Sequence, residues 1–349
     1  MALLTGSLPR IPLPQPAGTG TRYQEPPAVV ALGGGHGLSA SLAALRLLTT
    51  ELTAVVTVAD DGGSSGRLRR ELGVLPPGDL RMALAALCDD TEWGRTWRDV
   101  MQHRFKSAEH SEGSLDNHAV GNLLIVTLWE LLGNPVAGLQ WAGALLGARG
   151  QVLPMATVPL TIEGDVLTET PDGRLRTETV TGQSKLAAVG KDCHVNDVRL
   201  IPADAPACGE ALEAIELADW VILGPGSWYT SVLPHLMLPQ LRDALCRTTA
   251  RRVLTMNLAT DTKETSGMSA ADHLAVIQRY APEMRFDYVL ADPGAVEDRG
   301  RFEQAAGRLG AQAVFGKVGT LGGLPVHDPL RLAAAYHDIF GGSAEHAHA

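Results

Sequence analysis

The sequence has few cysteines and no long apolar segment. Its four cysteines are scattered over 349 residues, with no C-x-x-C pair and no Cys/His cluster at zinc-finger spacing, which fits a protein of the reducing cytosol. No apolar run reaches the roughly 18 residues that a membrane span needs. The N-terminus also lacks the basic segment and following apolar segment of a signal peptide. We therefore expect a cytoplasmic protein with no membrane insertion.

Positive charge is also scarce. Lys and Arg total 29 against 39 for Asp and Glu, so the formal net charge is −10. This balance argues against capture of nucleic acid or anionic membranes by a broad basic surface. The composition, with 45% hydrophobic and 19% charged residues, is that of a globular chain able to bury a sizeable core.

The two ends of the chain lack the periodicity of helices and strands. Residues 1–27 hold six of the 21 prolines and are predicted to form a disordered tail. Residues 341–349 are predicted to be a flexible C-terminal tail. The body between them, residues 28–340, is expected to be a single domain.

Apolar runs and glycine turns alternate along this body. Residues 28–58 contain an apolar run, a glycine turn, a segment of helical spacing and a second apolar run, which predict a βαβ unit. Residues 67–148 are predicted to be mostly helical, and about 151–200 to form a small β-rich insertion. Alternation of strand and helix returns from residue 220. The expected fold is α/β, Rossmann-like and doubly wound, with a mainly parallel sheet.

The first candidate site is the glycine turn after the first strand, Gly33-Gly34-Gly35-His36-Gly37-Leu38. Glycines permit close backbone approach, and the N-terminus of the next helix offers unpaired N–H groups to an anion. The turn differs from G-x-G-x-x-G at Leu38 and lacks the lysine of a P-loop. Its position favours a nucleotide or phosphate loop over a plain tight turn. His36 either donates to a ligand phosphate or only closes the turn.

An acidic pair, Asp60 and Asp61, follows the second strand and leads into Gly62, Gly63 and Ser64. Ligands of open α/β sheets bind at the carboxyl ends of the strands. The pair could accept hydrogen bonds from ribose or sugar hydroxyls, hold Mg²⁺ beside a phosphate, or cap the following turn. We favour ligand contact, and the glycine-serine backbone could form an anion-binding nest.

Three polar residues of the helical region are further candidates. Asp79 is predicted to be the N-cap of a helix, and Arg81 in its first turn opposes the helix dipole, which points to an anionic partner or marks a plain surface arginine. Asn122 lies at the start of the most apolar helix. If it is buried, it needs hydrogen-bond partners from a ligand or from the protein itself.

A second glycine turn, containing Gly224, Gly226 and Ser227, follows a later strand and leads into a hydroxyl-rich first turn that includes Thr230. The two glycine turns could converge, and Asn257 after the next strand could reach the same edge of the sheet. The pattern G-x-S-x-G is absent, and no His or Asp can be assigned to Ser227. No catalytic residue is therefore nominated.

Together these motifs resemble the gluconeogenesis factor family, the YvcK-like branch of the superfamily that also contains the 2-phospho-L-lactate transferases (CofD-like). The specific features are Ala-Asp-Asp-Gly-Gly-Ser-Ser-Gly-Arg-Leu-Arg and, later, Leu-Gly-Pro-Gly-Ser-Trp-Tyr-Thr-Ser. The matching stretches run through most of residues 28–280. They are Gly33 to Ser39, Thr57 to Arg69, Pro76 to Arg81, Gly121 to Leu124, Leu223 to Ser231 and the region of Asp272-His273-Leu274.

The resemblance implies a nucleotide-sugar ligand of the UDP-N-acetylglucosamine kind and a regulatory role in cell shape, envelope synthesis and growth on gluconeogenic carbon. It implies no known reaction and no required cofactor, with Mg²⁺ entering only with a nucleotide ligand. The family often has Thr where this chain has His36, and Arg where it has Val326. These departures leave the identity of the bound sugar nucleotide open. Protein partners and a homo-oligomeric state are open as well.

The transferase branch implies a competing activity, in which a nucleotide-activated phospholactate passes to a deazaflavin precursor with Mg²⁺. Asp61 and Asp79 would then be the candidate metal ligands. The sequence after Asp61 fits the YvcK-like branch better. An NAD-dependent oxidoreductase would use the same arrangement of strand, loop and acid, but no proton-transfer residue can be assigned.

Overall fold

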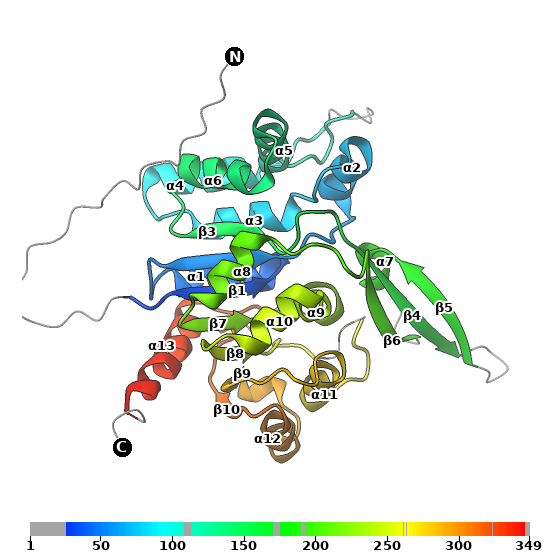
Figure 1. Ribbon diagram of the computed structural model, residues 1–349, viewed down its shortest axis with the longest axis vertical. Helices are drawn as coiled ribbons and strands as arrows, with labels where there is room; N and C mark the ends of the chain where they lie inside the picture. The colour runs from blue at the N-terminus through cyan, green and yellow to red at the C-terminus, as the bar shows by residue number, and fades with distance from the viewer. Residues whose placement is uncertain are drawn as a thin grey trace, which may run out of the picture.

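The computed structural model describes residues 26–107, 113–169, 175–189, 193–260, 262, 264–322 and 324–345 (Figure 1). The predicted N-terminal tail lies almost entirely outside these residues. The structure differs from the expectation at the C-terminal end. The sequence predicts a flexible tail over 341–349, but helix α13 (Pro329–Glu345) continues into this segment.

A seven-stranded sheet forms the centre of the molecule, in the order β10-β9-β8-β7-β1-β2-β3, and its strand pairs are parallel. β1, β2 and β7 are buried along their whole length, as strands of a parallel sheet covered on both faces should be. The predicted α/β, doubly wound fold is thereby confirmed. The strands are β1 (Val29–Gly33), β2 (Leu52–Val56), β3 (Gln151–Pro154), β7 (Trp220–Leu223), β8 (Arg251–Thr255), β9 (Tyr288–Ala291) and β10 (Gln312–Phe315).

Helices cover both faces of this sheet (Figure 1). α1 packs between α3 and α13 on one face, where α4, α5 and α6 surround α3, while α8, α9 and α10 lie on the other face. No helix in the described residues is long and apolar enough to cross a bilayer. The helices are α1 (Gly35–Leu45), α2 (Gly63–Leu72), α3 (Gly78–Leu87), α4 (Glu92–Gln102), α5 (Val120–Leu132), α6 (Pro135–Leu146), α8 (Gly209–Glu216), α9 (Leu233–Met237), α10 (Pro239–Arg247), α11 (Ala270–Tyr280) and α12 (Arg299–Arg308).

A small antiparallel sheet projects from one side of the main body (Figure 1). It contains β4 (Thr161–Glu169), β5 (Leu175–Thr181) and β6 (Cys193–Ile201), in the order β5-β4-β6. The β-rich insertion expected at 151–200 therefore begins only at β4, because β3 pairs with β2 in the main sheet. A short helix, α7 (Gln183–Leu186), lies between β5 and β6 and packs against β4 and β5.

The direction of strand addition reverses at β1. The chain runs from β1 to β2 and β3 on one side, and later places β7 to β10 on the other. The carboxyl ends of β1 and β7 therefore meet at a topological switch point, which is where open α/β sheets bind ligands. Both strands lead there into the glycine turns singled out in the sequence.

Tyr336 of α13 ties together the elements behind this switch point. Its side chain is fully buried, and its hydroxyl lies 3.0 Å from Ser41 Oγ on α1 and 2.9 Å from Thr255 Oγ1 at the end of β8. Ser41 Oγ also donates to the carbonyl oxygen of Gly224, at 3.1 Å. One hydroxyl group therefore links α13 to α1, to β8 and, through Ser41, to the second glycine turn.

We expect Tyr336→Phe to lower the free energy of unfolding by about 1 to 2 kcal/mol, because the substitution removes a partner shared by two buried hydroxyls. Tyr288→Phe is the matched control, since the Tyr288 hydroxyl makes no hydrogen bond with the described residues. Urea denaturation of both variants measures the difference. Equal losses in the two variants would contradict the role given to Tyr336.

Candidate functional site

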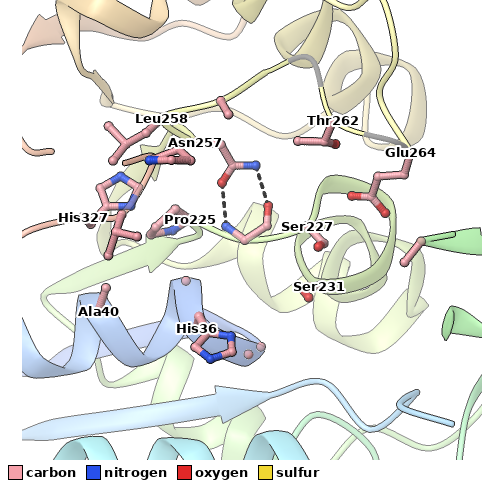
Figure 2. Close-up of a pocket in the computed structure, with 18 of the residues that line it drawn as sticks. His36, Ala40, Pro225, Ser227, Ser231, Asn257, Leu258, Thr262, Glu264 and His327 are labelled. Atoms are coloured by element: carbon pink, nitrogen blue, oxygen red, sulfur yellow. Dashed lines mark hydrogen bonds between the residues drawn. The ribbon is translucent and has the colours of Figure 1, made fainter. Parts of the chain in front are cut away.

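A cavity of about 550 Å³ opens at the switch point between the two glycine turns (Figure 2). His36 faces it from α1, and Asn257, Thr262 and Glu264 face it from the loop that follows β8. The structure brings these predicted site residues to its lining: Gly34, Gly35, His36, Gly37, Asp79, Gly226, Ser227 and Asn257.

The two glycine turns touch each other through their backbones. A Cβ atom on Gly37 would lie 2.2 Å from the carbonyl oxygen of Pro225 and 2.8 Å from Gly226 Cα. A Cβ atom on Gly34 would lie 2.5 Å from Asp79 Oδ2. Side chains cannot be accommodated at such distances, so glycine is required for the close approach. The sequence left open whether the two turns converge, and in the structure they do.

The sequence predicts Asp79 as the N-cap of α3. This prediction is wrong, because the N-cap of that helix is Pro77. The Asp79 carboxylate instead accepts a hydrogen bond from the backbone N–H of Gly35 at the start of α1, and its buried Oδ2 has no partner. Burial raises the pKa of Asp79 to about 7, and the nearby charge of Asp60 adds to the rise. Near neutral pH, the protonated form can therefore donate a hydrogen bond into the cavity.

Glu264 is a second buried carboxyl group of the cavity and lies at the second glycine turn. The backbone N–H groups of Trp228 and Tyr229 hydrogen-bond its carboxylate, and its buried Oε2 has no partner. Burial raises the pKa of Glu264 to about 7 in spite of these hydrogen bonds. No motif in the sequence predicts this residue as part of the site. The only signal for it was its place in the loop that begins at Asn257, at the carboxyl edge of the sheet.

Asn257 holds the second glycine turn in place. Its Oδ1 accepts from the Gly226 N–H at 2.9 Å, and its Nδ2 donates to the Gly226 carbonyl oxygen at 2.8 Å (dashed lines in Figure 2). Both ends of the amide are thus used by the backbone of one residue. The side chain lines the cavity, but its hydrogen bonds orient the turn.

The carboxylates of the acidic pair accept hydrogen bonds from the protein's own backbone. Asp61 Oδ1 accepts from the Ser184 N–H at 2.8 Å and so fastens α7, while Asp60 Oδ1 accepts from the Gly62 N–H at 2.9 Å. These contacts correspond to the capping alternative considered for the pair. The predicted site residues that do not line the cavity are Gly33, Leu38, Asp60, Asp61, Gly62, Gly63, Ser64, Arg81, Asn122, Gly224 and Thr230.

Ser64, Asn122 and Arg81 form a buried chain of hydrogen bonds instead. Asn122 Nδ2 donates to Ser64 Oγ at 3.0 Å, and Arg81 Nε donates to Asn122 Oδ1 at 2.9 Å. His118 Nδ1 lies 3.0 Å from the same Ser64 oxygen. Asn122 is therefore satisfied by the protein itself, which was the alternative to ligand contact.

Four further polar residues line the cavity, and no residue pattern in the sequence predicted them. Gln183 lies in α7, and Ser231 lies in the turn after Ser227. Thr262 and His327 lie in loops. Gln183 had no local signal, because only the docking of α7 on Asp61 brings it here. Val326, flagged through the family resemblance, also lines the cavity, as does His36. Both departures from the family pattern thus face the same space.

The described residues contain no group of three or more His, Cys, Asp or Glu side chains arranged to hold a metal ion. Of the two candidate ligands named for the transferase alternative, Asp61 is engaged by α7 and Asp79 keeps a free Oδ2. Mg²⁺ bound there would depend on phosphate oxygens of a ligand, as it commonly does.

Known proteins resemble this chain over most of its length. The family model described as 2-phospho-L-lactate transferase CofD matches residues 29–313. A protein of Mycobacterium leprae named "Putative gluconeogenesis factor" is 48% identical over 90% of this chain and 86% of its own length. The "Gluconeogenesis factor" of Halalkalibacterium halodurans is 39% identical over 77% of this chain and 79% of its own. A crystal structure of a UPF0052 family member from Bacillus halodurans has a TM-score of 0.76 and 34% identity, covering 89% of this chain and 99% of that one.

We expect Gly37→Ala to lower the free energy of unfolding by about 2 to 3 kcal/mol, because the added methyl group must push the two turns apart. Gly209→Ala on α8 is the control, since a Cβ atom there meets nothing within 4 Å. Urea denaturation should show a loss only in the first variant. A Gly37→Ala protein as stable as the Gly209→Ala protein would contradict the backbone contact.

The raised pKa of Glu264 predicts a dependence of stability on pH. From about pH 4.5 to pH 7 the folded protein keeps a proton that the unfolded chain releases, so this group lowers stability as the pH rises through that window. Glu264→Gln should therefore stabilise the protein by about 2 kcal/mol near pH 8, with the gain vanishing near pH 4. Thermal denaturation across this range measures it, with Glu216→Gln at an exposed position of α8 as the control. A gain independent of pH would contradict the assignment.

Proposed function

The chain belongs to the CofD family, and within it to the gluconeogenesis factors, and from this membership we propose that it is a cytosolic regulatory protein that binds a nucleotide sugar of the UDP-N-acetylglucosamine kind. Its output would be the control of cell shape and envelope synthesis during growth on gluconeogenic carbon. The observation that carries the proposal is the direct contact of the two glycine turns at the switch point. One cavity is thereby bordered by both turns.

The diphosphate would lie over these turns. In the first turn of α1, the N–H groups of His36 and Gly37 have no intrahelical acceptor, and the positive end of the helix dipole favours an anion. No Lys or Arg lines the cavity among the described residues. Phosphate binding would therefore rest on backbone N–H groups and on His36. Protonation of Asp79 and Glu264 reduces the repulsion that two carboxylates would otherwise exert.

The rest of the cavity suits a ligand rich in hydroxyl groups. Four of its lining residues carry a buried polar atom without a hydrogen-bond partner: Asp79 Oδ2, Gln183 Oε1, Glu264 Oε2 and His327 Nε2. Buried polar atoms are nearly always satisfied, so such a concentration is typical of a site completed by a ligand. Ribose and sugar hydroxyls can both donate and accept and would satisfy donors and acceptors alike.

One competing activity is supported by the match to the CofD model, namely the Mg²⁺-dependent transfer of a phospholactyl group from a nucleotide to a deazaflavin precursor. In that case the free Oδ2 of Asp79 would join the ligand phosphates in holding the metal ion. Asp61 is less suited than Asp79, because α7 occupies its carboxylate.

Calorimetric titration of the full chain with UDP-N-acetylglucosamine, UDP-glucose and NAD, each with and without Mg²⁺, tests the proposal. We expect saturable binding of a UDP-sugar without turnover, and no binding of NAD. Asn257→Ala should weaken UDP-sugar binding by about tenfold, because the variant loses both hydrogen bonds that orient Gly226. Asn196→Ala, on the exposed surface of β6, is the matched control.

Two outcomes would overturn the regulatory proposal. The absence of saturable binding for both UDP-sugars would reject the ligand class. Mg²⁺-dependent transfer of a phospholactyl group, abolished by Asp79→Asn in a folded protein, would assign the transferase activity instead.

A further inference from the structure

A second cavity, of about 650 Å³, lies between α1, α3 and α4. Four arginines line it, Arg46, Arg81, Arg98 and Arg104, against a single carboxylate, Asp99. This local excess of positive charge contrasts with a whole chain that carries 39 acidic and 29 basic residues. The basic cavity, as we call it, has no place in the binding of a nucleotide sugar described above, although His36 borders both cavities.

Two of the four arginines share one carboxylate of the protein. Arg46 and Arg98 both approach Asp90 Oδ1, at 3.0 and 3.4 Å, and both donate to the carbonyl oxygen of Cys88. Their guanidinium groups are therefore fixed at one end of the cavity.

Arg81 is different, because it is only 3% exposed and its hydrogen bonds go to neutral groups. Nε donates to Asn122 Oδ1 and Nη1 to Gln102 Oε1, and Nη2 makes no hydrogen bond with the described residues. A buried guanidinium group is strongly destabilising unless an anion is paired with it. Arg81 was also the residue whose place in a first helical turn pointed to an anionic partner.

Arg104 adds a second positive charge beside Arg81. Its Nη1 donates to the carbonyl oxygen of Asn117, and it forms no ion pair with the described residues. Burial, and next the charge of Arg104, lower the pKa of Arg81 to about 10, while the charges of Asp79 and Asp60 act in the opposite direction. An anion between the two guanidinium groups would convert their repulsion into attraction.

We propose that the basic cavity is a second ligand site, which binds a phosphorylated small molecule through Arg81 and Arg104. The planar fork of a guanidinium group matches phosphate oxygens in a bidentate manner, and two such groups can hold one phosphate from two sides. The volume leaves room for an organic part next to Met82, Ala85 and Ala86 of α3. The lining of this site differs from that of the nucleotide-sugar cavity except at His36, which borders both.

Titration calorimetry of the full chain with inorganic pyrophosphate, phosphate and citrate tests this site. We expect one molecule of pyrophosphate per chain, with an affinity that falls steeply as KCl is added, because the interaction is between charges. Arg104→Gln, at an exposed position, should weaken pyrophosphate binding by about tenfold. Arg81→Lys should do so as well, since lysine keeps the charge but not the fork. Arg70→Gln, on the exposed end of α2, should leave the affinity unchanged.

Further variants separate the two cavities. Asn257→Ala should leave pyrophosphate binding intact, whereas Arg104→Gln should leave UDP-sugar binding intact, so failure of one proposal is distinguishable from failure of the other. Unchanged pyrophosphate affinity in Arg104→Gln would overturn the site. Loss of pyrophosphate binding in Asn257→Ala would place the anion over the glycine turns instead. Citrate binding as tight as that of pyrophosphate would reject selectivity for phosphate.

Discussion

The contact between Gly37 and the backbone of Pro225 and Gly226 is the constraint on which the rest of the site depends. It joins the first turn of α1 to the turn after β7 with no side chain between them. Interactions of the neighbouring elements hold the two turns in this contact. Pairing of β1 with β7 sets the two turns side by side, Asn257 holds Gly226, and the Tyr336 hydroxyl links α1 and β8 behind them. A single cavity bordered by both turns is the result.

Charge is distributed between the two cavities in opposite ways. The cavity at the switch point, proposed to bind a nucleotide sugar, has two buried carboxyl groups, Asp79 and Glu264. Their raised pKa values make them hydrogen-bond donors for part of the time near neutral pH. The basic cavity has arginines and a single acid. Backbone dipoles can hold the diphosphate proposed for the first cavity with little added cationic charge, whereas the phosphate proposed for the basic cavity needs charge-assisted hydrogen bonds. The two sites thus suit different anions.

The antiparallel sheet of β4, β5 and β6 contributes to the site through α7, the short helix that follows β5. Asp61 accepts from the Ser184 N–H and fixes α7, and this places Gln183 on the cavity wall. Asp61, which follows β2, therefore shapes the cavity without lining it. The position of the acidic pair at the carboxyl edge of the sheet predicted ligand contact, whereas both side chains accept hydrogen bonds from the protein's own backbone.

The sequence by itself determined the α/β fold, because continuous apolar runs followed by glycine turns are characteristic of strands buried on both faces. It also determined the two glycine turns, since glycine is the one residue that fits a backbone contact such as that of Gly37. Only the tertiary structure decided which polar side chains border the cavity. Asn122 is satisfied by Ser64 and Arg81, and Glu264 reaches the site from a loop without a pattern. Hydrogen bonds between residues far apart in the chain leave no periodicity in the sequence, so their partners become visible only when the elements are packed together.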